Sequence, residues 1–157
     1  MRTLVQRVDR AHVDVDGETV GAIGRGLLLF VGVERGDTEA CARATADKVA
    51  ELRIFPGIAD EGGRARPMDC SVLDVGGACL VVSQFTLAAS LRKGRRPSFD
   101  AAMPPDRAEP LYLAVARHLE ARGLTVATGR FGAHMHVHLV NDGPVTLWIE
   151  CREGRIL

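Results

Sequence analysis

The segment "LVNDGPVTLWIE" (139–150) decides how the last part of this chain folds. Two apolar runs flank Asp142-Gly143, a dipeptide that is typical of a two-residue hairpin turn. The next residue, Pro144, has no backbone N–H, so it weakens strand pairing where the second run begins. Because only ~5–6% of X-Pro bonds in folded proteins are cis, these residues alone favour a trans proline that closes a hairpin.

Alternating and continuous apolar patterns in the rest of the sequence predict a chain rich in short strands. "LLLFVGV" (27–33) is apolar throughout, as in a strand that is buried on both faces. The predicted strands cover residues 3–9, 12–15, 18–23, 27–33, 78–87, 124–128, 135–140 and 145–150.

Two helices are predicted between these strands. The first should be capped by Asp37 or Thr38 and end near Leu52. The second should begin near Asp106, which stands at capping-box spacing from Glu109, and end at a Gly123 cap. The fold class is therefore α+β: a single compact domain over residues 1–157, with a largely antiparallel, barrel-like sheet and two main helices packed on it.

Composition narrows the function classes. The 157 residues carry a formal net charge of zero and are 46% hydrophobic, which argues against a module held to nucleic acid by bulk charge. The four cysteines form no C-x-x-C pair, so we expect reduced, mostly buried thiols. No apolar run is long enough for a membrane span, and the N-terminus lacks an apolar signal core. We expect a cytoplasmic protein without membrane contact and without a cofactor.

Polar side chains gather where the apolar strand "ACLVVSQFTL" (78–87) ends. In a strand over residues 78–87, Ser83 and Phe85 face one way, and Gln84 and Thr86 face the other. Sites are often built at strand ends, although such side chains also bond to nearby backbone. No G-x-S-x-G elbow surrounds Ser83, so a serine hydrolase is a weak interpretation.

Two further clusters have both a functional and an ordinary interpretation. His134, His136 and His138 would share one face of a strand and could hold a metal ion, or could be ordinary surface histidines. A loop contains four cations that could grip phosphate locally or could simply be solvated, namely Arg92, Lys93, Arg95 and Arg96.

Three separated stretches resemble the D-aminoacyl-tRNA deacylases. They are "QRV" (6–8) with "VDG" (15–17), "VVSQFTL" (81–87) followed by "KGRRPSFD" (93–100), and "LVNDGPVT" (139–146). Between them stand "IGRGLLLFVGV", "LRIF", "DVGG" and "TGRFGA", in the order that the family shows.

The resemblance implies a homodimer that hydrolyses the ester bond of a D-aminoacyl-tRNA. In this interpretation a cis Gly143-Pro144 peptide enters the pocket of the partner subunit and leaves no room for an L side chain. Glycyl-tRNA, including alanine tRNA mischarged with glycine, should then be accepted too, because glycine has no side chain to collide. Arg7 should brace the Gly-Pro segment.

The resemblance also assigns the remaining site residues. Ser83, Gln84 and Thr86 are the candidate catalytic residues, with Thr86 either attacking the ester or positioning it. Phe85 and Met135 should bind the substrate, which includes the terminal adenosine of the tRNA. His134 and His136 depart from the family pattern around Met135.

Three alternatives remain open at this stage. One is a relative with a trans Gly-Pro peptide and the opposite chirality. Another is a metal-dependent hydrolase that uses His134, His136 and His138. The third is a noncatalytic tRNA-binding module.

Overall fold

A computed structural model describes residues 1–59 and 63–157. Residues 60–62, inside the loop predicted over 55–67, lie outside the described residues. Within the described part, seven strands form one sheet in the order β5-β4-β3-β1-β6-β7, and β2 pairs with β1 outside this path. The strands are β1 (Arg2–Val15), β2 (Glu18–Ile23), β3 (Gly26–Gly32), β4 (Ala78–Ser83), β5 (Thr125–Thr128), β6 (His136–Arg152) and β7 (Arg155–Ile156).

The sheet is mixed, although most of its pairings are antiparallel. Strand β1 pairs antiparallel with β2, β3 and β6, and β6 pairs antiparallel with β7. Strands β3 and β4, and then β4 and β5, are parallel. Parallel neighbours need a crossover connection, which α1 (Glu39–Glu51) and α2 (Pro105–Ala121) provide. The predicted α+β class is confirmed.

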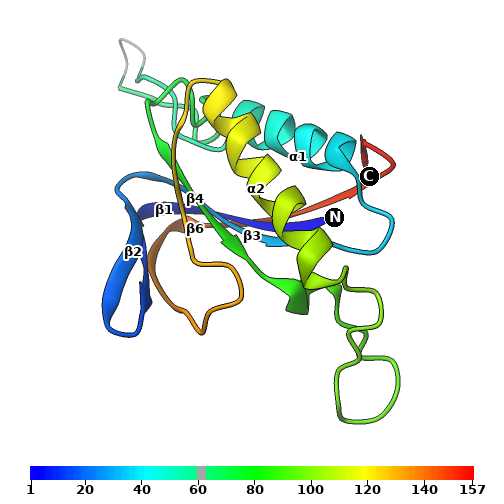
Figure 1. The fold of residues 1–157 in the computed structure, drawn as a ribbon. Coiled ribbons are helices and arrows are strands. Elements are labelled where there is room, and N and C mark those ends of the chain that lie inside the picture. The colour runs from blue at the N-terminus through cyan, green and yellow to red at the C-terminus, as the bar shows by residue number, and fades with distance from the viewer. Residues whose placement is uncertain (60–62) are drawn as a thin grey trace.

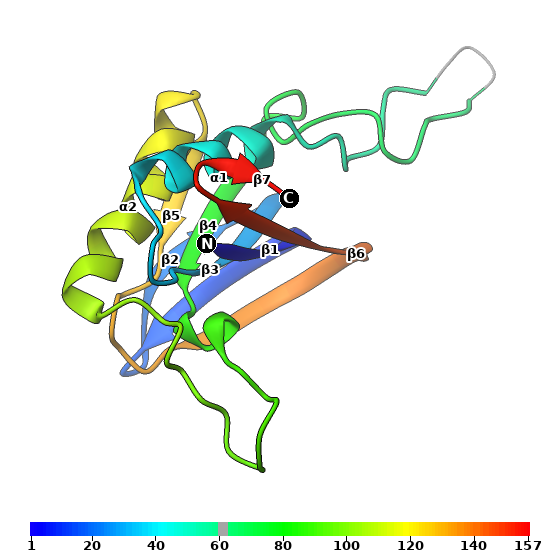
Figure 2. The ribbon, with the colours of Figure 1, turned by 90° about the vertical axis from the view of Figure 1, so that its right-hand side faces the viewer.

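Both helices cover the same face of the sheet and lie against each other (Figures 1 and 2). Beneath them, Leu29 of β3 and Val81 of β4 belong to the larger hydrophobic cluster. Their neighbours Leu28 and Val82 point to the opposite face and join a second cluster, with Val13 of β1. Because β2 and the first half of β6 close over this second cluster, the sheet curls into a half-barrel.

The predicted hairpin at Asp142-Gly143 is wrong. The two apolar runs around it belong to one strand, β6, and both pair with β1 rather than with each other. The predicted strands 3–9 and 12–15 likewise form the single strand β1. Local turn chemistry indicated a reversal, but a long partner strand keeps both halves of β6 extended.

The helix boundaries are close to those predicted, but the expected side-chain capping at the two N-termini is absent. Helix α1 begins after Thr38, whose side chain makes no capping hydrogen bond. Helix α2 begins after Pro104, with Pro105 in its first turn and no capping box from Asp106 and Glu109. Proline suits the first helical position because its fixed φ is already helical. At the other end Gly123 has φ +89° and terminates the helix as predicted.

The four cysteines are free thiols, as expected. Cys41, Cys79 and Cys151 are buried, and Cys70 is half-buried. Burial raises the pKa of Cys79 to about 12 and that of Cys151 to about 11, so both stay protonated at neutral pH. Neither α1 nor α2, nor any other helix in the described ranges, combines the length and apolar character that a membrane crossing requires.

Candidate active site

A cavity of about 670 Å³ opens where β4 ends. The loop after β5 and the start of α2 form its other walls. This volume lies in the range typical of small-molecule sites. The chemically useful lining residues come from several separate segments: Arg35, Ser83, Gln84, Phe85, Phe99, Tyr112, Phe131, His134 and Met135.

The chain turns sharply at the cavity, which corrects the prediction of a strand to residue 87. Strand β4 ends at Ser83, and the short 3-10 helix η1 covers Phe85–Ala88. The backbone N–H of Gln84 donates to the Val31 carbonyl at 2.8 Å, which anchors the turn to β3. Phe85 and Thr86 therefore do not alternate across a strand as expected.

Aromatic rings give the cavity its apolar character. Phe85 is 58% exposed and meets the edge of Phe99 at a centroid distance of 5.0 Å. Deeper in, Phe131 packs against Tyr112 at 5.9 Å. Sequence reasoning missed Phe99, Phe131 and Tyr112 as site residues. Phe99 and Phe131 belong to the family-like stretches "KGRRPSFD" and "TGRFGA", which could have indicated them. Tyr112 lies within the predicted second helix, where no motif distinguishes it from core residues.

Among the described residues, no carboxylate lines the cavity. Arg35 is engaged, since its Nε donates to the Asp100 carbonyl at 2.9 Å. Tyr112 donates its hydroxyl to the Val81 carbonyl at 2.9 Å, and burial raises its pKa to about 12. The phenol is therefore neutral at physiological pH and does not serve as a base.

The predicted catalytic side chains do not form a nucleophile–base pair. Ser83 and His134 both line the cavity, but no hydrogen bond joins them within the described part of the chain. The Gln84 side-chain amide donates to the Thr86 hydroxyl oxygen. Thr86 is exposed beside the cavity rather than in its lining. A nucleophilic hydroxyl needs an adjacent base, so this arrangement favours positioning over attack.

The Gly-Pro segment forms a bulge on β6 opposite Arg7. Thr146 pairs with Gln6, and Asn141 pairs with Val8, so residues 142–145 stand opposite one residue of β1. The Gly143-Pro144 peptide is cis, as the resemblance implies, and both residues are exposed. The extra residues bend the strand and lift this peptide out of the ladder.

Arg7 braces the bulge from below. Its side chain is buried, and its Nε lies 2.8 Å from an Asp142 carboxylate oxygen, an ion pair without the alignment of a hydrogen bond. Another guanidinium nitrogen donates to the Ile54 carbonyl, and the group stands 5.9 Å from the centre of the Phe55 ring. Arg7 thus contacts the Gly-Pro segment, as expected.

Asn141 and Gly143 complete the brace. The Asn141 side-chain amide donates to the carbonyls of Arg7 at 2.9 Å and Val145 at 3.0 Å, across the base of the bulge. Gly143 has φ +117°, and a Cβ there would stand 3.0 Å from an Arg7 nitrogen. The position therefore requires glycine.

Arg7, Gly143 and Pro144 do not line the cavity of their own chain. The structure therefore separates the predicted site residues into two groups. Ser83, Gln84, Phe85 and Met135 line the cavity, and the braced peptide stands apart from it on the exposed side of β6.

The predicted basic loop projects beside the cavity. Ser90 and Ser98 pair through two backbone hydrogen bonds of 2.8 and 3.0 Å, and the chain between them extends away from the sheet (Figure 2). Its four cations are exposed and make no ion pair with any described residue: Arg92, Lys93, Arg95 and Arg96.

The expected three-histidine face does not form. Strand β6 begins at His136, whereas His134 lies in the preceding loop and lines the cavity. The rings of His134 and His136 meet edge to face at 5.0 Å. His138 instead lies close to Asp14 and His12 of β1. The hydrolase that would use His134, His136 and His138 around one metal is not favoured.

Comparison with known proteins places the chain in a family. A family model described as D-Tyr-tRNA(Tyr) deacylase matches residues 4–150. Proteins called D-aminoacyl-tRNA deacylase from Halalkalibacterium halodurans, Thermomicrobium roseum and Heliobacterium modesticaldum are 56%, 57% and 58% identical to it. These alignments cover 97%, 99% and 98% of this chain, and 100%, 97% and 99% of the relatives. The chain belongs to the D-Tyr-tRNA(Tyr) deacylase family.

Two solved structures share the fold of this chain. The structure titled "c-Myc DNA Unwinding Element Binding Protein" has a TM-score of 0.85 at 40% identity, and the match covers 96% of this chain and 99% of that one. A "probable eukaryotic D-amino acid tRNA deacylase" has a TM-score of 0.77 at 21% identity, with coverages of 94% and 97%. The second likeness shows the fold alone, and the resemblance to the deacylase family seen in the sequence is confirmed.

The brace around the bulge can be tested through stability. Asn141→Asp removes the amide that serves two carbonyls and places a carboxylate against them. We expect a loss of about 1–2 kcal/mol in the free energy of unfolding, measured by urea denaturation.

Gln6→Ala is the matched control, because it removes only an exposed hydrogen bond of 3.2 Å to Thr146 on the same ladder. Its effect should stay within about 0.5 kcal/mol. Equal losses in the two variants would show that Asn141 does not hold the bulge.

Proposed function

We propose that this protein hydrolyses the ester bond of D-aminoacyl-tRNA and releases the free amino acid and the tRNA. The observation that carries the proposal is its family membership, with full-length relatives at 56–58% identity that are called D-aminoacyl-tRNA deacylase. The reaction makes the protein a carboxylic ester hydrolase that proofreads translation. Cytoplasmic residence follows from the location of its substrate and is part of the proposal.

The cavity suits the terminal adenosine and the esterified amino acid. Unpaired bases at RNA ends are commonly bound by stacking on aromatic side chains, and Phe85 and Phe99 present such a surface. Met135 and the apolar wall around it can accommodate many side chains without forming specific hydrogen bonds. Broad tolerance of D side chains follows.

The chemistry needs no protein nucleophile. Water adds to the ester carbonyl, the acyl–oxygen bond breaks, and the ribose oxygen leaves with a proton. The vicinal ribose hydroxyl can assist the water, since no described residue supplies a carboxylate base to the cavity. Phe85 and Thr86 begin η1, where backbone N–H groups lack helical partners and can donate to the developing oxyanion. Ser83, Gln84 and Thr86 then orient the ester.

Chiral selection requires a second subunit. Gly143 and Pro144 are exposed and lie outside their own chain's cavity, so we assign them to the pocket of a partner in a homodimer. The apolar side chains of Val140 and Trp148 are exposed along the same strand, as expected for a strand that meets another subunit. With the α-ammonium and the carbonyl both held, an L side chain would collide with this backbone.

Glycine escapes this selection because it has no side chain to collide. Glycyl-tRNA should therefore be cleaved, and alanine tRNA mischarged with glycine becomes a second target. The same geometry excludes L-alanine, whose methyl group already meets the obstructing backbone.

The exposed basic loop supplies a contact to the rest of the tRNA. Arg92, Lys93, Arg95 and Arg96 stand beside the mouth of the cavity, and none of them makes an ion pair with a described residue. Phosphates near the acceptor end would lie within reach when the terminal adenosine is bound. Such contacts fix register without reading sequence.

The proposed activity predicts a specific order of substrates. Purified protein should deacylate D-tyrosyl-tRNA and glycyl-tRNA and leave L-tyrosyl-tRNA intact, because only the L side chain meets the obstruction. The measurement is acid-precipitable labelled amino acid over time, with spontaneous hydrolysis subtracted. Adding a chelator should leave the rates unchanged.

Equal cleavage of both enantiomers would contradict the selection mechanism. Binding of D-tyrosyl-tRNA without turnover would instead indicate a noncatalytic module. Sedimentation velocity gives the necessary control, since the chain of 16.9 kDa should sediment as a dimer. A monomer that still discriminates would overturn the role of the partner subunit.

Thr86→Ala separates positioning from attack. If Thr86 only orients the ester, kcat should fall by about tenfold or less, while a lost nucleophile costs roughly 10³-fold or more. Single-turnover deacylation of D-tyrosyl-tRNA measures the step, and circular dichroism checks the fold. The larger loss in a folded variant would make Thr86 the nucleophile.

The basic loop can be tested by charge reversal. The double variant Arg95→Glu, Arg96→Glu should weaken tRNA binding and lower the slope of log K against log salt by about 1 per lost phosphate contact. The double variant Arg43→Glu, Arg117→Glu, on the exposed sides of α1 and α2, changes the net charge by the same amount and is the control. Equal effects of the two changes would remove the loop from the tRNA contact.

A further inference from the structure

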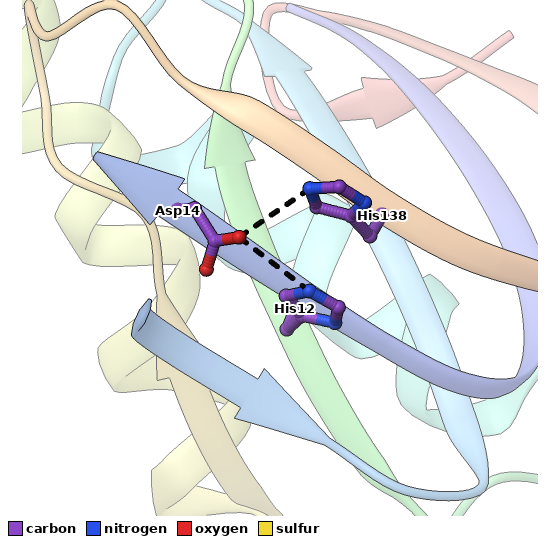
Figure 3. Close-up of side chains that lie close together, drawn as sticks. All are labelled: His12, Asp14 and His138. Atoms are coloured by element: carbon purple, nitrogen blue, oxygen red, sulfur yellow. Dashed lines mark ion pairs between the residues drawn. The ribbon is translucent and has the colours of Figure 1, made fainter. Parts of the chain in front are cut away.

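Three potential metal ligands meet on the outer face of the curled sheet. His12 and Asp14 belong to β1, and His138 belongs to β6 (Figure 3). None of the three lines the cavity. The mechanism proposed above uses none of them, and the expectation of a histidine metal site named only one of them.

Strand pairing brings these side chains together. His12 stands directly opposite His138 in the antiparallel register, and Asp14 is two residues farther along the same face. The two imidazole rings stack at a centroid distance of 4.4 Å, with 7° between their planes. The backbone ladder, rather than a flexible loop, therefore sets the spacing of the cluster.

Both histidines direct the same nitrogen at one oxygen. The Nε2 atoms of His12 and His138 lie 3.6 and 3.4 Å from Oδ2 of Asp14. All three ligand atoms fall within 4.8 Å of one another. These separations exceed hydrogen-bond length, and they leave room for a cation between the ligand atoms.

The carboxylate is oriented by an outer contact. Thr19 of β2 donates its hydroxyl to Oδ1 of Asp14 at 2.6 Å, which leaves Oδ2 free toward the histidines. Metal ligands are commonly held by outer partners of this kind, which fix ligand orientation and raise affinity. Residues of β1, β2 and β6 therefore all contribute to this cluster.

We propose that His12, Asp14 and His138 bind a single Zn²⁺ ion. Two imidazole nitrogens and one carboxylate oxygen form a ligand set that zinc accepts, and water would complete a tetrahedron. Zinc–ligand distances are about 2.0–2.2 Å, so the ligand atoms must converge slightly on binding. The side chains are 41%, 27% and 53% exposed and have the freedom to do so.

The ion would fasten β1 to β6 behind the wall of the cavity. Val137 precedes His138, points inward and lines the cavity, while Val13 stands opposite it on β1. Zinc on the outer face would therefore stabilise the strand pair that carries this wall. Its role is structural, since the ion stands on the opposite side of the strands from the reacting ester.

Zinc titration of chelator-treated, dialysed protein tests the site. Isothermal titration calorimetry should show one Zn²⁺ per chain, and thermal unfolding should shift upward with added zinc because the ion binds the folded state. His138→Ala and His12→Ala should abolish this binding, and Thr19→Val should weaken it about 10–100-fold.

His136→Ala and His134→Ala are matched controls, since these neighbouring histidines lie outside the cluster. They should keep the affinity and the thermal shift of the wild type. Circular dichroism without metal confirms that each variant folds, and the exposed His138 is the substitution least disruptive to folding. Deacylation need not be measured, so the outcome is independent of the proposed function.

Two results would overturn the proposal. One is the absence of stoichiometric zinc binding by the wild-type chain. The other is an equal loss of binding in His136→Ala and His138→Ala, which would place the ion on β6 alone.

Discussion

The long antiparallel pairing of β1 with β6 holds the curled sheet together. Strand β1 also pairs with β2 and β3, so it connects both halves of the curled sheet. Where the ladder is interrupted, Arg7 fills the space beneath four residues of β6 and holds the exposed Gly143-Pro144 peptide in place. The Gly143-Pro144 peptide, to which we assign the discrimination between D and L substrates, therefore lies on the most extensively paired strands of the fold.

The cavity has a different origin, because it lies where β4 gives way to a 3-10 helix. Its lining is largely aromatic and apolar, and no carboxylate contributes to it within the described residues. A site of this kind can hold a substrate and polarise it through backbone N–H groups, but its described lining supplies no carboxylate as a general base. The aminoacyl ester of the proposed substrate is itself reactive toward water, so a cavity that mainly binds and polarises it is sufficient for hydrolysis.

Sequence patterns predicted the elements better than their connections. Apolar periodicity located both helices and most strands because burial imposes it directly on the residues. The hairpin at Asp142-Gly143 failed because a two-residue signal cannot show that both flanks share a distant partner. Ser83, Gln84, Phe85 and Met135 were found through recognised motifs, whereas Tyr112 and the grouping of His12 with His138 depend on tertiary pairing that no local pattern encodes.

On the two sides of the bulge, each of β1 and β6 contributes side chains to a different hydrophobic core. Val5 packs under the helices, whereas Val13 of the same strand packs inside the curl; Ile149 and Leu139 divide β6 in the same way. Neither core can come apart while these shared strands stay intact. The domain should consequently lose amide protection in both halves at once, as a single cooperative unit without a separately melting lobe.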